Sequence, residues 1–419
     1  MESFDLNKNT EELYNYNHKT KNISNNKDNE INLIIKINEI DVNKDIYFLD
    51  NIDEEEKKKT EHDKLNEMNE SNTDLYINGI KYEFKKYFNF ENEGEFHIKL
   101  KFKFIMKDCS FMFYYCKNII NIDLSNFNTS NIINMERMFC GCENLIDINL
   151  SNFETKNVTN MRSMFFNCKK LKNINLSNFD TKNVINMKSM FNSCEILTHI
   201  NLSTFDTKNV TNMLQMFYGC KNLININIST FDTSNVTDLS CFFYGCENLK
   251  QIDVSHFNTK NVTDISFMFF DCKKLNSINL SNFDTKNVNN MKCIFSGCQN
   301  LIDINLSNFN TNNVIYMSQM FYGCKNLISL NLSHFNTKNV VTMKGMFYEC
   351  EALTFLDISN FNINISTNII YLFCGCINLT NIKLSNIDTH NLISDIFYNC
   401  LNTPKNYFSY FRYKDNNEN

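Results

Sequence analysis

Cysteine is the residue type in this chain whose spacing could support chemistry. The 419-residue sequence contains 17 cysteines, and eleven of them recur at intervals of 26 positions. They are Cys116, Cys142, Cys168, Cys194, Cys220, Cys246, Cys272, Cys298, Cys324, Cys350 and Cys376. Thiols at a fixed interval could form disulfides between stacked turns of the chain, bind a metal ion, or be oxidised in a redox role.

Neither metal binding nor disulfide formation is favoured by the surrounding residues. The C-x-C pairs Cys140/Cys142 and Cys374/Cys376 have no cluster of histidines or acids beside them, so we expect no metal site. Cysteines on stacked strands about 4.8 Å apart could approach disulfide range. Cysteine is also a small hydrophobic residue that is often buried, and thiols stay reduced inside cells. We expect buried free thiols, with a disulfide or redox role as the alternative.

The repeat around each cysteine predicts the structure that positions it. The unit that begins at Cys142 reads CENLIDINLSNFETKNVTNMRSMFFN. Self-similarity at a fixed period of 20–50 residues is typical of a solenoid, in which each unit forms one coil and contacts only its neighbours. We therefore expect a linear stack of coils.

Each coil is predicted to contain one strand, a second short extended segment and a short helix. Ile148 and Leu150 alternate with polar residues as in a strand, and Val158 begins the second extended segment. Asn160 stands at the position of a helix N-cap. From 161 to 168, apolar residues follow at i, i+3, i+4 and i+7, which is one face of a helix, and glycine often precedes the cysteine as a helix end. The predicted fold class is an α/β repeat solenoid that is leucine-rich-repeat-like.

The chain divides into four regions by composition and pattern. Residues 1–30 are rich in Asn, Lys and Glu and are expected to form a disordered tail. Residues 31–107 are expected to form a β-rich N-terminal capping region with a charged insertion at 51–72. The solenoid is expected over 108–400 as about eleven 26-residue repeats, and 401–419 as a C-terminal cap and tail.

The capping region carries one specific hairpin signal. Residues 81–90 and 95–104 each alternate apolar and polar side chains, and Asn92-Glu93-Gly94 between them is a turn sequence. This arrangement predicts that the two segments pair with each other.

Charge and hydropathy indicate which partners and compartments to expect. The formal net charge is -6 and no basic stripe is present, so nucleic acid is not expected as a partner. The N-terminal sequence MESFDLNKNT lacks the basic and apolar regions of a secretory signal, and no run of about 18 apolar residues occurs. We therefore expect a cytoplasmic protein without a membrane span.

Two outward columns of the predicted strand are the candidate partner-binding face. One column is nearly uniform in Asn and Asp, whereas the other varies from repeat to repeat. The candidate residues are Asp147, Asn149, Asn173, Asn175, His199, Asn201, Asn225, Asn227, Gln251, Asp253, Asn279, Asp303, Asn305, Asn331 and Phe355. Protein-binding sites usually carry aromatic or arginine anchors, and few stand here, so a solvated strand face is the competing interpretation.

Three further polar columns have structural explanations. The residue after the repeat cysteine alternates between lysine and glutamate, as at Lys117 and Glu143, so stacked coils would place opposite charges side by side. The column of Asn157 is expected to be a ladder that satisfies backbone groups of the next coil. The column of Thr155 allows comparison with ice-binding surfaces, but its long charged neighbours would spoil a flat face.

No catalytic or cofactor-binding pattern accompanies the repeat. The sequence has no P-loop, G-x-G-x-x-G, G-x-S-x-G or zinc signature, and His199, His256, His334 and His390 stand on different repeats. We expect no enzymatic activity, no cofactor and no metal.

The repeat consensus, L-x-x-I-N-L-S-x-F-[DN]-T-x-N-V-x-x-M-x-x-M-F-x-x-C, resembles that of the BspA-type leucine-rich-repeat family of bacterial surface proteins. The resemblance covers about residues 110–400. It implies a non-catalytic solenoid with a role in adhesion or protein binding. From the sequence we expect no signal peptide, lipobox cysteine or wall anchor, which would be a departure from the bacterial pattern.

Pattern and resemblance together predict a non-catalytic scaffold that mediates protein–protein interaction through its strand face. The alternative is a surface-exposed adhesion or structural protein. Such a protein would reach the cell surface by a non-classical route and could bind a carbohydrate or another cell-surface ligand.

Overall fold

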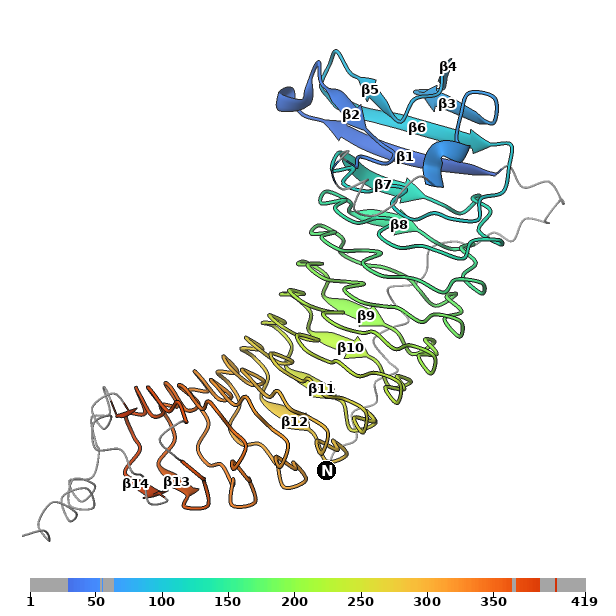
Figure 1. Cartoon of the computed structure of the whole chain (residues 1–419). Helices are drawn as coiled ribbons and strands as arrows, with labels where there is room; N and C mark the ends of the chain where they lie inside the picture. Colours follow the sequence, from blue (N-terminus) through green and yellow to red (C-terminus); the bar gives the residue numbers. More distant parts are fainter. Residues whose placement is uncertain (1–28, 53–54, 56–63, 364–366, 385–395, 398–419) are drawn as a thin grey trace, which may run out of the picture.

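The chain forms a curved stack of coils that is closed at its N-terminal end by a β-sheet (Figure 1). The computed structural model describes residues 29–52, 55, 64–363, 367–384 and 396–397. Residues 1–28 of the expected tail and the expected C-terminal cap at 401–419 lie outside these ranges. Among the described residues, no helix has the length and apolar character needed to cross a membrane.

The N-terminal sheet joins the cap to the first two coils. Its strands are β1 (Glu30–Ile37), β3 (Thr73–Ile77), β4 (Ile80–Tyr82), β6 (Gly94–Phe102), β7 (Ile119–Asp123) and β8 (Asp147–Asn149). They lie in the order β4-β3-β6-β1-β7-β8. Because β1 runs antiparallel to β7, the cap pairs with the strand edge that the first coil would otherwise expose. Alternate residues of β1, from Ile31 to Ile37, are fully buried in the core.

The hairpin expected between residues 81–90 and 95–104 is not formed. Segment 81–90 instead divides between the end of β4, which pairs with β3, and β5 (Tyr87–Asn89), which pairs with β2 (Asp45–Tyr47). β6 begins at Gly94, the last residue of the expected turn, but β1 and β3 occupy its two edges. The short 3-10 helices η1 (Glu39–Asp41) and η2 (Lys64–Glu67) lie in the connections.

The coils carry short parallel strands on one side. These are β9 (His199–Asn201), β10 (Asn225–Asn227), β11 (Gln251–Asp253), β12 (Ser277–Asn279), β13 (Phe355–Ile358) and β14 (Asn381–Leu384). β9 pairs with β10, β11 with β12 and β13 with β14, each in a register of one repeat. The expected second extended segment is one residue long: Asn134, Asn160 and Asn186 form successive parallel bridges.

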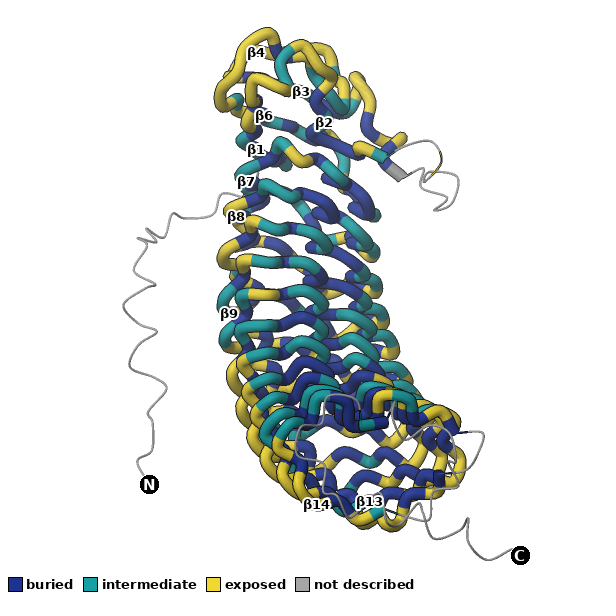
Figure 2. Tube along the Cα trace, turned by 90° about the vertical axis from the view of Figure 1, so that its left-hand side faces the viewer, coloured by how far each residue is buried: buried dark blue, intermediate teal, exposed yellow. Residues whose placement is uncertain are grey.

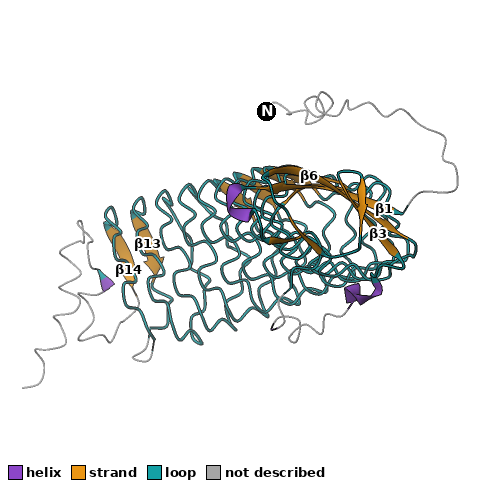
Figure 3. Ribbon diagram, turned by 90° about the horizontal axis from the view of Figure 1, so that it is seen from above, coloured by secondary structure: helices purple, strands orange, loops and turns teal. Residues whose placement is uncertain are grey.

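The helix expected from Met161 to Cys168 is not formed: overlapping turns take its place, and the described coils up to residue 384 contain no helix there (Figure 3). The N–H groups of Met164 and Cys168 donate to the carbonyls of Met161 and Phe165, three residues earlier. The N–H of Phe165 donates instead to the carbonyl of Met190 in the next coil, at 2.9 Å. In an α-helix all these N–H groups would bond within the same segment. Here every second N–H donates to a carbonyl of the next coil instead.

Backbone angles in the same segment explain the recurring glycine. Ser163 and Asn167 have φ of 53° and 60°, which a right-handed helix does not contain. The position of Asn167 is glycine in several other repeats, such as Gly219 and Gly245, with φ of 68° and 69°. A positive φ at the third of four residues is what a type II turn requires. The glycine therefore serves a turn and does not end a helix.

Stacked aromatic rings show that the coils lie closest together on the turn side. In the Phe165 column, ring centroids of successive coils are 5.2 and 5.7 Å apart. In the Phe179 column, near the strand, the corresponding distances are 5.8 and 6.3 Å. This difference bends the stack. In Figure 1 the closely spaced turns line the inner side of the bend, and β13 and β14 lie on its outer side.

Side-chain ladders add hydrogen bonds between coils. The Asn157 Nδ2 donates to the carbonyl of Ser130 at 2.8 Å, so the predicted asparagine ladder is formed, toward the preceding coil. The threonine column is buried, which excludes the surface file considered for it. The Thr207 hydroxyl donates to the carbonyl of Asp232 at 3.0 Å and accepts from its N–H at 2.7 Å. Each such threonine fastens one coil to the next.

Thr207→Val is expected to lower the free energy of unfolding by about 1–3 kcal/mol, because valine keeps the volume and leaves two backbone groups of Asp232 without their partner. Thr204→Val, at an exposed position of the same coil, is the matched control and should have little effect. The melting temperatures of the two variants provide the measurement. Equal melting temperatures would show that the buried threonine bonds contribute no stability.

Candidate functional site

The cysteine column is part of the core and offers no reactive thiol. The described cysteines are free, and those of the column are buried. The Cys220 thiol donates a hydrogen bond to the carbonyl of Phe191 in the preceding coil, with sulfur and oxygen 3.1 Å apart. The same contact recurs along the column, for example from Cys246 to Phe217 at 3.2 Å. Burial raises the pKa of Cys220 to about 12, so the nucleophilic thiolate is not available at neutral pH.

The alternating charges after the repeat cysteine neutralise one another. Glu143 lies between Lys117 and Lys169, with nitrogen–oxygen distances of 3.1 and 2.9 Å. Lys221 pairs with Glu195 at 3.0 Å in the same way. Each exposed pair contributes about 0–1 kcal/mol and leaves no charge of one sign for a ligand. In the described residues, no group of three or more His, Cys, Asp or Glu side chains could hold a metal ion.

The candidate partner-binding residues share one exposed side of the stack. All fifteen, from Asp147 to Phe355, are exposed. Register brings their two columns into line, since Asn225 lies opposite His199 and Asn227 opposite Asn201. In Figure 2 exposed residues run along the edge of the stack that carries β8 and β9. We call these two columns the strand face.

The nearly uniform column of the strand face has a structural role. The Asn201 side-chain oxygen accepts a hydrogen bond from the N–H of Ser203 at 3.1 Å, and Asp253 does the same for Ser255 at 2.9 Å. Asn and Asp recur at this position because their side chains hold the turn that leaves each strand. The second column, which contains His199, varies from coil to coil and is the one that could specify a partner.

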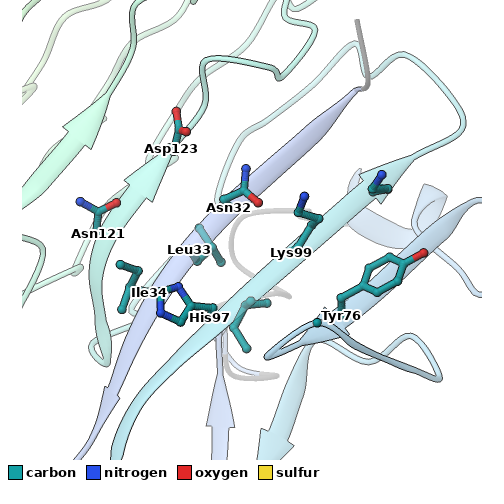
Figure 4. Close-up of a pocket in the computed structure, with 11 residues that line it drawn as sticks. Asn32, Leu33, Ile34, Tyr76, His97, Lys99, Asn121 and Asp123 are labelled. Atoms are coloured by element: carbon teal, nitrogen blue, oxygen red, sulfur yellow. The ribbon is translucent and has the colours of Figure 1, made fainter. Parts of the chain in front are cut away.

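The cap extends the strand face beyond the residues predicted from the sequence. Asn32 on β1 lies opposite Asp123 on β7 and Lys99 on β6, and Lys99 lies opposite Tyr76 on β3. Asp123 in turn lies opposite Asn149 on β8, a member of the uniform column. One row of side chains therefore crosses five strands of the sheet, from Tyr76 on β3 to Asn149 on β8. Figure 4 shows Asn32, Lys99 and Asp123 on neighbouring strands along this row.

A shallow cavity of about 530 Å³ lies on this part of the face (Figure 4). Its lining includes His97, Lys99, Lys101 and Asn121. The ammonium groups of Lys99 and Lys101 lie 3.2 and 3.4 Å from carboxylate oxygens of Glu30. Charged and aromatic side chains thus replace the asparagines of the coils at the capped end. The alternation in residues 95–104 indicates the outward positions of β6, but the sequence does not show the pairing of β1 with β6 and β7 that joins this strand to the coils.

Comparison with known proteins identifies the repeats. A family model described as "Mycoplasma protein of unknown function, DUF285" matches residues 107–223, 193–304 and 294–410. No curated protein matches the chain. Among solved structures, the crystal structure of the TLR13–ssRNA13 complex is similar to the chain at 14% identity, with a TM-score of 0.24. The match covers 65% of this chain and 41% of that one, so the chain spans less than half of that protein's length.

Alkaline pH is expected to destabilise the stack through its buried thiols. Below the pKa of an unfolded cysteine, about 8.5, both states keep the proton and stability is unaffected. Between that value and the pKa of about 12 for Cys220, only the folded state keeps it. The free energy of unfolding should then fall by about 1.4 kcal/mol per pH unit for each such thiol.

Melting temperatures measured from about pH 7 to pH 11 test this expectation. Cys220→Ala should reduce the steepness of the alkaline decline by the contribution of one thiol. Met216→Ala removes a neighbouring buried side chain that does not ionise, so it should lower stability equally at every pH. A melting temperature that stays constant up to about pH 11 would contradict the assignment of neutral buried thiols.

Proposed function

The chain belongs to the family described as Mycoplasma protein of unknown function, DUF285, and we propose that it is a non-catalytic repeat scaffold that binds another protein through its strand face. The repeat consensus, with its resemblance to BspA-type leucine-rich repeats, supports the same role. A stack of similar coils presents an extended surface, which is how solenoids commonly bind partners.

The observation that carries this proposal is the continuity of the strand face across the cap. The outward side chains of β1 and β6 are aligned across the sheet with the outward side chains of β7 and β8. The exposed surface therefore does not end at the first coil. A stable protein–protein interface buries about 800 Å² on each partner, an area that requires several adjacent strands of this length.

The two columns of the strand face have different roles, and this difference favours recognition of a specific partner. The column of Asn201 and Asp253 is fixed by the turns that it holds. The side chains of the other column do not hold these turns. Their residue type changes from coil to coil, as at His199, Asn225, Gln251 and Phe355. A constant framework with variable side chains at one position per coil can discriminate between partners without altering the fold. The exposed aromatic ring of Phe355 is the type of side chain that anchors interfaces.

Charge substitution on three adjacent coils tests the proposal. The triple variant His199→Glu, Asn225→Glu and Gln251→Glu places three carboxylates on the strand face. The tagged full-length chain would be crosslinked in its native cells and recovered, and the co-purified proteins quantified. The partner is expected to be recovered at least tenfold less with this variant than with the unaltered chain.

The matched control places the same substitutions on another side of the same coils. Thr211, Thr237 and Thr263 are exposed and each follows its counterpart by twelve positions, so their replacement by glutamate adds equal charge to these coils. This control should retain the partner, and both triple variants should melt as the unaltered chain does. Equal recovery from the two variants would overturn the assignment of binding to the strand face.

A further inference from the structure

A column of aromatic side chains on the turn side of the coils lacks a ring at several positions, among them Asn192 and Ser296, and a cavity lies at Ser296. Tyr218, Tyr244 and Phe270 stack with ring centroids 4.3 and 4.5 Å apart. Two coils beyond Phe270, Tyr322 stacks on Tyr348 at 4.7 Å. The residue at this position in the coil between them is Ser296, whose side chain has no ring. The column therefore lacks one ring between Phe270 and Tyr322.

The missing ring leaves a cavity of about 370 Å³, which we call the ring slot. Its lining includes Phe270, Ser296, Gly297, Tyr322 and Gly323. Ser296 is only 2% exposed and lies at its floor. Successive rings on either side of the gap stack at 4.5 and 4.7 Å, so a ring placed at the missing position would face Phe270 on one side and Tyr322 on the other.

A carboxylate without a hydrogen bond lies beside the slot. The Asp271 N–H donates to the carbonyl of Ser296 at 2.7 Å, which fixes its backbone against the missing position. Its side-chain oxygen lies over Gly297, where a Cβ would approach to 2.1 Å, so a larger residue there would displace the Asp271 carboxylate. Within the described residues, this carboxylate has no hydrogen-bonding partner. Burial raises the pKa of Asp271, with Lys273 acting in the opposite direction.

We propose that the ring slot binds a tyrosine or tryptophan side chain of a partner polypeptide, whose ring completes the aromatic column and whose edge O–H or N–H donates to Asp271. Gly297 and Gly323 favour a polypeptide because they leave bare backbone beside the slot, where another main chain can approach closely. The slot lies on the turn side of the coils, away from the strand face. Its occupancy is therefore independent of the function proposed above.

The absence of tryptophan from the chain provides a direct test. The fluorescence of the probe peptide Ac-Gly-Trp-Gly-NH₂ would report binding to the full-length protein without background from protein tryptophan. We expect a saturable blue shift that Ac-Gly-Tyr-Gly-NH₂ reverses by competition. Ac-Gly-Phe-Gly-NH₂ lacks the donor and should compete about threefold to tenfold more weakly. Ac-Gly-Leu-Gly-NH₂ should not compete.

Two variants that each introduce a tyrosine test whether the probe peptide binds in the ring slot. Ser296→Tyr supplies the missing ring from the chain itself and should weaken probe binding at least tenfold while preserving the fold. Asn192→Tyr is the matched control, because Asn192 occupies the same position between Phe166 and Tyr218, where its side-chain oxygen accepts a hydrogen bond from the Ser193 hydroxyl. The control should bind the probe as the unaltered chain does. Far-ultraviolet circular dichroism and melting temperatures verify that both variants are folded.

Three results would overturn the proposal. One is the absence of saturable binding by the tryptophan peptide. Another is binding that Ser296→Tyr leaves unchanged. The third is an affinity for free 3-methylindole that equals the affinity for the peptide, which would assign the slot to small planar molecules instead of a polypeptide. The strand-face variants with glutamate at residues 199, 225 and 251 should bind the probe normally, so failure of either proposal is distinguishable from failure of the other.

Discussion

The structure depends on one constraint: no coil can satisfy its own backbone. Between Met161 and Cys168, alternate N–H groups find their acceptors only in the next coil, as Phe165 does in Met190. An unpaired buried N–H is costly, so the coils are stable only as a stack. The buried polar side chains serve the same requirement, since Thr207 and Cys220 each bond to a backbone carbonyl of an adjacent coil. At the first coil the cap satisfies this requirement, because β1 pairs with β7.

The sequence predicts the period and the buried columns because burial acts on side chains, whose spacing is visible in the repeat. It does not predict the turns from Met161 to Cys168, since overlapping turns return side chains to the core at the same spacing as a helix face. What separates the two is the destination of the N–H groups, which is decided by the neighbouring coil. The strand pairing of β6 and the row from Tyr76 to Asn149 are likewise set by tertiary contacts. The positions of the strand face follow from alternation, whereas the ring slot follows from the absence of a ring at Ser296, and that absence has meaning only after the coils are stacked.

The two candidate surfaces differ in how the repeat produces them. On the strand face, a variable position is superimposed on a constant one, so each coil contributes a different side chain to a regular surface. In the ring slot, the reverse holds: the column carries Tyr or Phe in most coils, Ser296 has no ring, and the cavity lies at this position. Both surfaces arise at single positions of the repeat whose side chains do not make the contacts that the rest of their column makes.

The sequence separation between the residues that bond adjacent coils has a consequence for how genes of this kind change length. The threonine bonds span 25 positions, the asparagine bonds 27 and the cysteine bonds 29, while the strands pair at 26. All four spans survive together only if a coil is gained or lost whole. A tandem duplication of 26 codons, 78 nucleotides, lengthens the stack without disturbing any contact, whereas a single-codon insertion displaces every ladder that crosses it. Length should therefore drift in units of one repeat.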